Sequence, residues 1–375
     1  MVPLPSADVT LVDDGFAGPV DRQGHGLQRA FILTLLQHLA RVSGENIAAA
    51  PAGDDDVDGL NEDEALLREV ARQVPSLILG IEEPELYQHP TKQRHFAKVL
   101  ELLSDGQLPG AAGNTQVVFC SHSPLFASMH KFQQIRLARR VPLEGSEIKQ
   151  CELRESNLQE VAHRLEHAFE RPAGTFTDAT LLPRLHILGA ELAEGFFASC
   201  NVIVEGPSDK AALIATASLL GGELEANGIA ILPAGGKTNL DRPAAIFSSL
   251  GIPTFVMWDC DNGDGAVQNR ALPRLFENDA AYGQQPETVV RPFWASFERK
   301  LEATLHNELG GAALEMAHLE ACVEYGMTPG GDAMKSPAVM TRTLEIAADS
   351  GARCATLEAI VRAIFALRGV ELEPQ

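Results

Sequence analysis

The sequence predicts an α/β protein, because two apolar strands are each followed by a turn and a helix or a polar loop. Residues 202–204 (Val-Ile-Val) form a β-branched run that is typical of a buried strand. Gly206 and Pro207 end this run, and a helix is expected to begin near Lys210. Residues 255–258 form a second apolar run of the same kind. Strands that alternate with helices favour a Rossmann-like parallel sheet.

Acidic residues follow both strands at the points where the strands end. Glu205 ends the first strand and Asp209 lies at the start of the next helix, while Asp259 and Asp261 follow the second strand. Residues two apart in an extended segment point the same way, so Asp259 and Asp261 are expected to share one cation. Open α/β sheets bind ligands at this edge. Four hard oxygen donors suit Mg²⁺ or Mn²⁺ better than zinc.

These acidic residues resemble a known pattern. Residues 205–209 (Glu-Gly-Pro-Ser-Asp) with residues 259–261 (Asp-Cys-Asp) look like the E…DxD pattern of Toprim domains, which are found in topoisomerases, primases and OLD-family nucleases. Taken alone, residues 205–209 are more typical of a helix start, and residues 259–264 are more typical of a solvated acidic turn. Both together, in order and each behind an apolar strand, favour a metal site.

Length and composition indicate a soluble protein of two domains. The chain has 375 residues, is 45% hydrophobic and 22% charged, and contains no apolar run near the roughly 20 residues that a membrane span needs. Its first residues lack a signal-peptide pattern, so a cytoplasmic location without membrane contact is expected. Six scattered cysteines without a CxxC pair argue against a zinc ribbon or a disulfide framework.

The net charge of −21 argues against nucleic-acid binding over a broad surface. Part of this acidity lies in residues 54–64, which are expected to form a solvated loop. If DNA is the partner, its contact must be local, and bound divalent metals would offset the carboxylates of the site.

The N-terminal third carries three segments typical of ABC-type ATPases. Glu82 and Glu83 end a strand predicted over 77–81, and His122 ends a strand that begins near residue 116. In such ATPases the first acid helps to hold Mg²⁺ and the second polarises the attacking water. His122 resembles the switch histidine of these enzymes. With residues 24–28 (Gly-His-Gly-Leu-Gln), the ordered trio resembles the C-terminal half of an OLD-type ATPase, the remnant of an ATP site.

This resemblance implies three regions: the C-terminal part of an ATPase domain over 1–145, a helical connector over 146–198, and a Toprim nuclease domain with a helical extension over 199–375. Residues 135–143 and 147–153 are expected to be strands that close the ATPase part. No G-x-x-x-x-G-K-[ST] loop precedes residue 24, and residues 235–238 fail that pattern. The chain is therefore a fragment, a truncated reading frame or one part of a larger assembly. ATP binding would need a missing N-terminal part, and no independent ATP hydrolysis is expected.

Two later features complete the resemblance. Residues 296–305 are predicted to be helical, with Glu298 and Glu302 one turn apart on one face. In OLD nucleases a glutamate after the DxD strand helps to bind the second metal, and Glu302 is the first choice here, followed by Glu298. Lys335 resembles the lysine that these enzymes use near the scissile phosphate. Lys237, after two glycines, either contacts a phosphate or belongs to a plain loop.

The resemblance implies a metal-dependent DNA endonuclease or nickase of the OLD family. Glu205, Asp259 and Asp261 would hold one Mg²⁺ or Mn²⁺ ion, and Asp209 and Glu302 would help to hold the second. The two ions would clamp the attacking water and the leaving 3′ oxygen, while Lys335 would offset charge on the phosphate. The ATPase part would pair two copies into a homodimer on DNA. The sequence does not distinguish between phage DNA, a plasmid and a repair intermediate as the target.

Three other functions are weighed against this one. A Toprim topoisomerase needs a nucleophilic tyrosine, and Tyr87, Tyr282 and Tyr325 lie in no recognisable context for that role. A primase needs a template-handling part that the sequence does not display. A non-catalytic ATPase-type dimerisation module would leave the acidic cluster without a function. Plasmid nicking with Mg²⁺ or Mn²⁺ separates that module from a nuclease.

Overall fold

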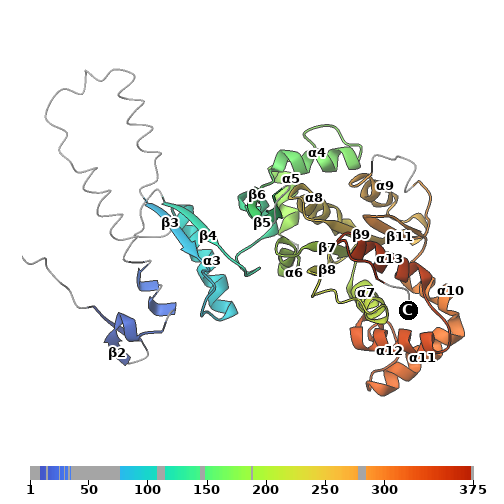
Figure 1. Ribbon diagram of the computed structural model, residues 1–375. Helices are drawn as coiled ribbons and strands as arrows, with labels where there is room; N and C mark the ends of the chain where they lie inside the picture. Colours follow the sequence, from blue (N-terminus) through green and yellow to red (C-terminus); the bar gives the residue numbers. More distant parts are fainter. Residues whose placement is uncertain are drawn as a thin grey trace, which may run out of the picture. The chain divides into compact units, whose positions relative to one another are not determined.

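The protein is described by a computed structural model and divides into two compact units, Met1–Phe126 and Ala127–Gln375 (Figure 1). The structure describes residues 9–13, 16–24, 26–28, 30–32, 34, 77–107, 115–143, 148–186, 189–277 and 284–372. The predicted acidic loop over 54–64 and His25 of the predicted glycine-rich turn lie outside the described residues. The domain boundaries at residues 145 and 198 stay predictions.

The first unit contains a β-α-β element. Strand β3 (Leu77–Glu82) pairs in parallel with β4 (Thr115–Cys120), and helix α3 (Pro90–Ser104) connects them. Leu79, Leu100 and Leu103 are buried between the helix and the strands. The two strands predicted before Glu82 and His122 are thus confirmed. Before them, strands β1 (Thr10–Asp13) and β2 (Phe16–Pro19) form an antiparallel pair.

The second unit is built on a five-stranded sheet. The strands lie in the order β10-β11-β9-β7-β8, and every neighbouring pair is parallel except β10 with β11. The strands are β7 (Cys200–Val204), β8 (Ile229–Pro233), β9 (Thr254–Asp259), β10 (Val289–Val290) and β11 (Trp294–Phe297). The predicted α/β fold with a parallel sheet is confirmed.

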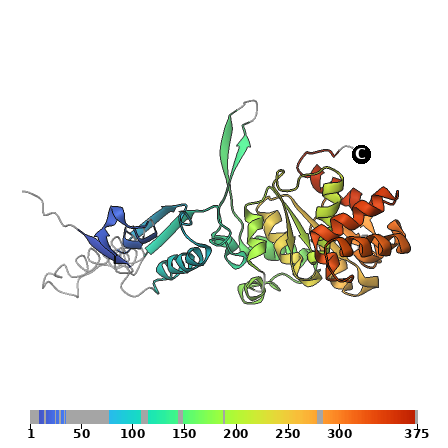
Figure 2. The same ribbon diagram turned by 90° about the horizontal axis from the view of Figure 1, so that it is seen from below.

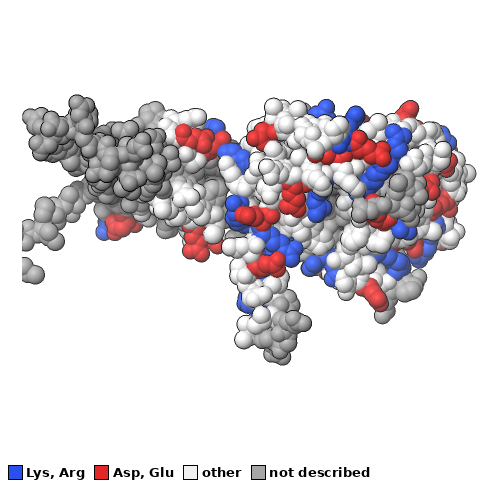
Figure 3. All heavy atoms as spheres, turned by 90° about the horizontal axis from the view of Figure 1, so that it is seen from above, with Lys and Arg blue, Asp and Glu red and all other residues white. Residues whose placement is uncertain are grey.

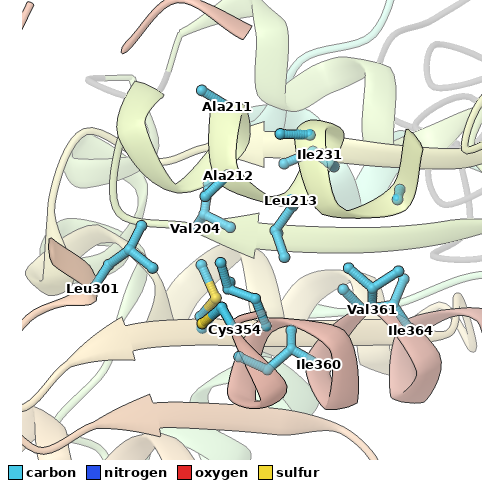
Figure 4. Close-up of a cluster of buried hydrophobic side chains, with 14 of the residues drawn as sticks. Val204, Ala211, Ala212, Leu213, Ile231, Leu301, Cys354, Ile360, Val361 and Ile364 are labelled. Carbon is cyan, nitrogen blue, oxygen red and sulfur yellow. The ribbon is translucent and has the colours of Figure 1, made fainter. Parts of the chain in front are cut away.

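Helices cover both faces of this sheet because its strands are apolar on both sides. Val204 belongs to one buried cluster, with helices α7 (Pro207–Leu219) and α13 (Ala355–Ala366) (Figure 4). Its neighbour Ile203 belongs to a cluster on the other face, with helix α8 (Asp241–Ser249). Right-handed crossovers place α7 and α8 on opposite faces, because the chain moves from β7 to β8 and then back past β7 to β9.

Further helices extend both layers. They are α4 (Leu158–Ala168), α5 (Asp178–Leu185), α6 (Ala190–Ala193), α9 (Ala266–Arg274), α10 (Leu301–Leu309), α11 (Gly311–Glu324) and α12 (Pro337–Asp349). Short 3₁₀ turns are η1 (Val20–Arg22), η2 (Met129–Gln134), η3 (Glu194–Phe196), η4 (Lys237–Asn239), η5 (Asp261–Gly263) and η6 (Ala333–Lys335). Within the described residues, no helix is long and apolar enough to cross a membrane.

Two sequence predictions are corrected by the structure. The helix predicted over 296–305 is wrong at its start, because Ser296 and Phe297 lie in β11 and α10 begins only at Leu301. All four residues of β11 are buried, and they pair with β9. The strands expected to close the ATPase part, β5 (Leu137–Pro142) and β6 (Lys149–Arg154), instead pair with each other as a hairpin of the second unit (Figure 2).

Helix α13 is part of the core of the second unit, which allows a stability test. Phe365 is fully buried, and its ring lies against Gly222 after α7. We predict that Phe365→Ala lowers the free energy of unfolding by about 3–5 kcal/mol, because it leaves a cavity. Urea unfolding followed by tryptophan fluorescence measures this, since Trp258 and Trp294 lie in β9 and β11.

The control for this measurement is Met316→Ala, because Met316 in α11 is 73% exposed. Its effect should stay within about 0.5 kcal/mol. Equal unfolding free energies for the two variants would contradict a core role for α13.

Candidate active site

The carboxyl ends of β7 and β9 meet where the strand order reverses. The chain leaves β7 for β8 on one side and returns to β9 on the other side. At such a switch point the two following loops turn to opposite faces of the sheet and leave a crevice between them. Glu205 follows β7 directly, and Asp259 is the last residue of β9.

Glu205 and Asp259 are in direct contact. Oε1 of Glu205 accepts a hydrogen bond from the backbone N–H of Asp259 at 2.8 Å. The carbonyl oxygen of Glu205 accepts a bond from the N–H of Gly236, after β8. Glu205 is thereby fixed against the ends of both neighbouring strands. The predicted convergence of these two strand ends agrees with this contact.

Two helix N-termini provide donors to the other carboxylates. Oδ2 of Asp209, in the first turn of α7, accepts a bond from the N–H of Gly206 at 2.8 Å. Oδ1 of Asp259 accepts a bond from the N–H of Leu301 at 3.0 Å, where α10 begins. Free N–H groups and the helix dipole make such N-termini favourable for negative charge.

Asp261 lies in a different environment from Asp259. The chain leaves the extended conformation at Cys260, and Asp261 adopts a φ of +50°. The expectation that Asp259 and Asp261 lie on one extended segment is therefore wrong. The reason is a set of backbone bonds, since Cys260 and Asp261 donate to the carbonyl groups of Phe297 and Arg299 and fold the loop over the end of β11.

The carboxyl groups of Glu205, Asp209 and Asp259 all have raised pKa values. Burial is the main cause for each group. Repulsion between the carboxylates adds to it and brings the pKa of Asp209 to about 7 and that of Asp259 to about 8. The charge of Glu302 contributes to both of these shifts. Each of these carboxyl groups is therefore harder to ionise here than in water.

Glu302 and Glu298 differ in their relation to this cluster. Glu302 lies in the first turn of α10, and its charge acts on Asp209 and Asp259. Glu298 lies in the loop before α10, so the two are not one turn apart on one helix. The electrostatic coupling favours Glu302 over Glu298, in the order that the sequence indicated.

Lys335 forms an ion pair with a neighbouring residue. It lies in η6, and Nζ donates to Oδ1 of Asp332 at 2.7 Å. Within the described residues, no hydrogen bond or ion pair joins Lys335 to the acidic cluster. The structure brings Glu205, Asp209 and Asp259 together, and the role of Lys335 stays a prediction.

Sequence reasoning left the role of Lys237 open, and the structure gives it a place in the site. Nζ of Lys237 lies 2.8 Å from Oδ2 of Asp261, and the side chain is only 9% exposed. Asn269, in α9, is also buried against this loop and accepts a bond from Lys237. The only sequence signal was a lysine after Gly235-Gly236 at the end of a strand.

The donor chemistry of the cluster fits a hard divalent cation. The groups are carboxylates, and burial raises their pKa values, so a bound cation would stabilise their ionised forms. As the side chains stand, however, no three His, Cys, Asp or Glu residues in the described ranges gather closely enough to hold an ion. Each carboxylate now accepts internal bonds, so an ion would have to draw the side chains toward itself.

The first unit brings a second set of predicted residues together. Nε2 of His122 lies 3.8 Å from Oε1 of Glu83. Glu85 binds the same loop, because its carboxylate accepts bonds from the N–H of His122 and the hydroxyl of Ser121. Glu82 ends β3 directly before them. Glu83 has a φ of +46°, in the left-handed region.

Two family models match the regions that carry these motifs. Residues 196–261 match the family described as "Overcoming lysogenization defect protein-like, TOPRIM domain". Residues 4–127 match the AAA ATPase domain family. The C-terminal region of the Xanthomonas campestris pv. campestris OLD protein matches with 19% identity over 47% of this chain and 96% of that chain, at a TM-score of 0.32.

Two curated relatives are nucleases. The OLD nuclease of Thermus scotoductus (strain ATCC 700910 / SA-01) is 28% identical over 195 residues, which are 52% of this chain and 32% of that protein. The Old nuclease of Escherichia phage P2 is 22% identical over 251 residues, 66% of this chain and 35% of that protein. The matches thus span about a third of the length of these relatives. The chain carries an AAA-type ATPase segment followed by an OLD-like Toprim domain, and the resemblance to OLD-family proteins that its motifs indicated is confirmed.

Proposed function

We propose that this chain is a divalent-metal-dependent DNA endonuclease or nickase that hydrolyses phosphodiester bonds at the cluster of Glu205, Asp209 and Asp259. The observation that carries this proposal is the hydrogen bond from the N–H of Asp259 to Glu205, which joins the ends of β7 and β9. The similarity to two proteins named OLD nucleases supports the same activity.

The chain's own residues would hold and orient the reacting groups. Bound Mg²⁺ or Mn²⁺ would supply an activated water and stabilise the leaving oxygen of the phosphodiester. Glu205, Asp259 and Asp261 would hold one ion, and Asp209 and Glu302 the second. The backbone N–H groups of Gly206 and Leu301 hold the carboxylates of Asp209 and Asp259 by hydrogen bonds.

DNA is the proposed substrate, and its approach has to be local. Figure 3 shows basic and acidic side chains interspersed on the drawn face of the second unit. The net charge of −21 repels a polyanion at long range. Cations held by the carboxylate cluster would reverse that repulsion at one place. Lys335 would reach the phosphate only after leaving Asp332, and pairing of two chains into a homodimer would present two sites to one duplex.

Removing one carboxylate of the cluster should abolish nicking. We predict that Asp259→Asn and Glu205→Gln each lower the rate of Mg²⁺- or Mn²⁺-dependent nicking of supercoiled plasmid by at least about 100-fold, because even residues that only support metal ligands contribute 10–100-fold. Glu315→Gln, on the exposed surface of α11, is the control and should cut at the wild-type rate. EDTA should stop the wild-type protein. Wild-type cutting by Asp259→Asn would refute the assignment.

The raised pKa of Asp259 predicts how stability depends on pH without metal. Its folded-state pKa of about 8 exceeds its ordinary value of 3.8, so the folded protein holds this proton more tightly than the unfolded chain. The resulting stabilisation is complete below about pH 4 and is lost as the pH rises through about 8. In EDTA, the melting temperature of Asp259→Asn should therefore rise relative to that of the wild type as the pH increases from about 4 to about 8.

A bound metal ion should counteract the loss of stability that the wild-type protein shows as the pH rises. A divalent cation stabilises the charged carboxylates, so Mg²⁺ should raise the melting temperature of the wild type more at pH 8 than at pH 5. Asp259→Asn should show a smaller rise. If the melting temperatures of the two proteins in EDTA differed by the same amount at all pH values, the raised pKa of Asp259 would be wrong.

We further propose that Glu83 and His122 belong to a remnant ATP site that does not hydrolyse ATP by itself. Their contact at 3.8 Å supports this, since a switch histidine has to sense the water-polarising acid. The pure 375-residue chain should hydrolyse no ATP above the background of a Glu83→Gln variant. Hydrolysis that Glu83→Gln removes would show a complete site in this chain.

A further inference from the structure

A buried lysine holds the loop that carries Asp261. Lys237 comes from η4, after β8, and its side chain is only 9% exposed. Its ammonium group has three hydrogen-bond donors. Three acceptors surround it: Oδ2 of Asp261 at 2.8 Å, the carbonyl oxygen of Asp264 at 3.1 Å and Oδ1 of Asn269 at 3.4 Å. A buried charge requires such pairing, and here the pairing is complete.

The loop that Lys237 contacts has an unfavourable backbone conformation. Asp261 and Asn262 have φ values of +50° and +56°, and Gly263 and Gly265 are also positive. Non-glycine residues in this region cost energy and persist only where surrounding contacts impose them. Asp261 belongs to this turn, so contacts that hold the turn also set the direction of its carboxylate.

Asn269 completes the clamp from a second element. It is buried in α9, and its Nδ2 donates to the carbonyl oxygen of Cys260 at 3.1 Å. The carbonyl groups at both ends of the turn, those of Cys260 and Asp264, are therefore bonded by Asn269 and Lys237. This arrangement locks the turn between β8 on one side and α9 on the other.

We propose that Lys237 is a positioning residue for the metal site, one that fixes the turn 260–264 so that Asp261 reaches the cation held by Glu205 and Asp259. This inference rests on the proposed function. Lys237 itself would contact neither the ion nor DNA, since its three donors are used within the clamp. Its substitution should release the turn and weaken metal binding.

A simple electrostatic role predicts the opposite result. If Lys237 only supplied positive charge near Asp261, its removal would make the pocket more negative and would tighten cation binding. Lys300 provides the matched comparison, because its Nζ lies 4.0 Å from Oδ1 of the same carboxylate but the side chain is 63% exposed. Removing Lys300 changes the charge without removing the clamp.

The test measures Mn²⁺ binding rather than cleavage. The full-length wild type, Lys237→Met, Lys237→Gln and Lys300→Met are titrated with Mn²⁺, and free ion is followed by electron paramagnetic resonance. Fluorescence of Trp258, next to Asp259, is a second readout. We expect both Lys237 variants to bind Mn²⁺ at least about 10-fold more weakly, as for other residues that orient metal ligands. Lys300→Met should bind as tightly as the wild type or more tightly.

A measurement without metal separates this inference from the proposed function. In EDTA, hydrogen exchange of the amides at residues 260–264 should be faster in both Lys237 variants than in the wild type and Lys300→Met. The melting temperature and the hydrogen exchange of β7 identify a variant that is merely unfolded. If Lys237→Met does not fold, the polar variant Lys237→Gln is used in its place.

Each outcome decides a separate claim. Equal or tighter Mn²⁺ binding by folded Lys237 variants overturns the positioning role. Unchanged exchange at residues 260–264 overturns the clamp itself. If the wild type binds no Mn²⁺, the metal-dependent nuclease is refuted, and faster exchange in the Lys237 variants then shows that the clamp serves only the structure of the loop.

Discussion

The hydrogen bond between the N–H of Asp259 and the carboxylate of Glu205 is the contact on which the site depends. It exists because β7 and β9 are neighbours in space although 54 residues separate the two partners. The crossovers through α7 and α8 pack on opposite faces of the sheet, so the two strand ends lie side by side at a switch point. The same topology that buries the apolar strands therefore brings their acidic ends into contact.

Gathering carboxylates at this point costs stability, and the structure offsets part of the cost with backbone dipoles. The N-termini of α7 and α10 both direct N–H groups at the cluster, through Gly206 and Leu301. Burial and then repulsion between the carboxylates nevertheless raise the pKa of Asp259 to about 8, in spite of the bond from Leu301. A site that retains buried carboxylates, in place of apolar residues that would pack at no electrostatic cost, is typical of function rather than of folding.

The sequence predicted those parts of the structure that local patterns determine. The strands before Glu205 and Asp259 were apparent from their β-branched and apolar runs, and the bond between these residues agrees with the predicted convergence. Strand β11 was missed because it has only four residues, and the charged residues 298–300 that follow it gave the segment a helical pattern. Its burial comes from pairing with β9, which no local pattern records.

The environment of Asp261 was not predictable for the same reason. The spacing of Asp259 and Asp261 indicates a shared direction only while the chain stays extended, and bonds to Phe297 and Arg299 end that conformation at Cys260. Asp261 is then directed by Lys237, which lies 24 residues earlier in the chain. An acidic pair in a sequence therefore fixes the chemistry of a site, whereas its geometry is set by the distant strands and side chains that hold the turn between the two acids.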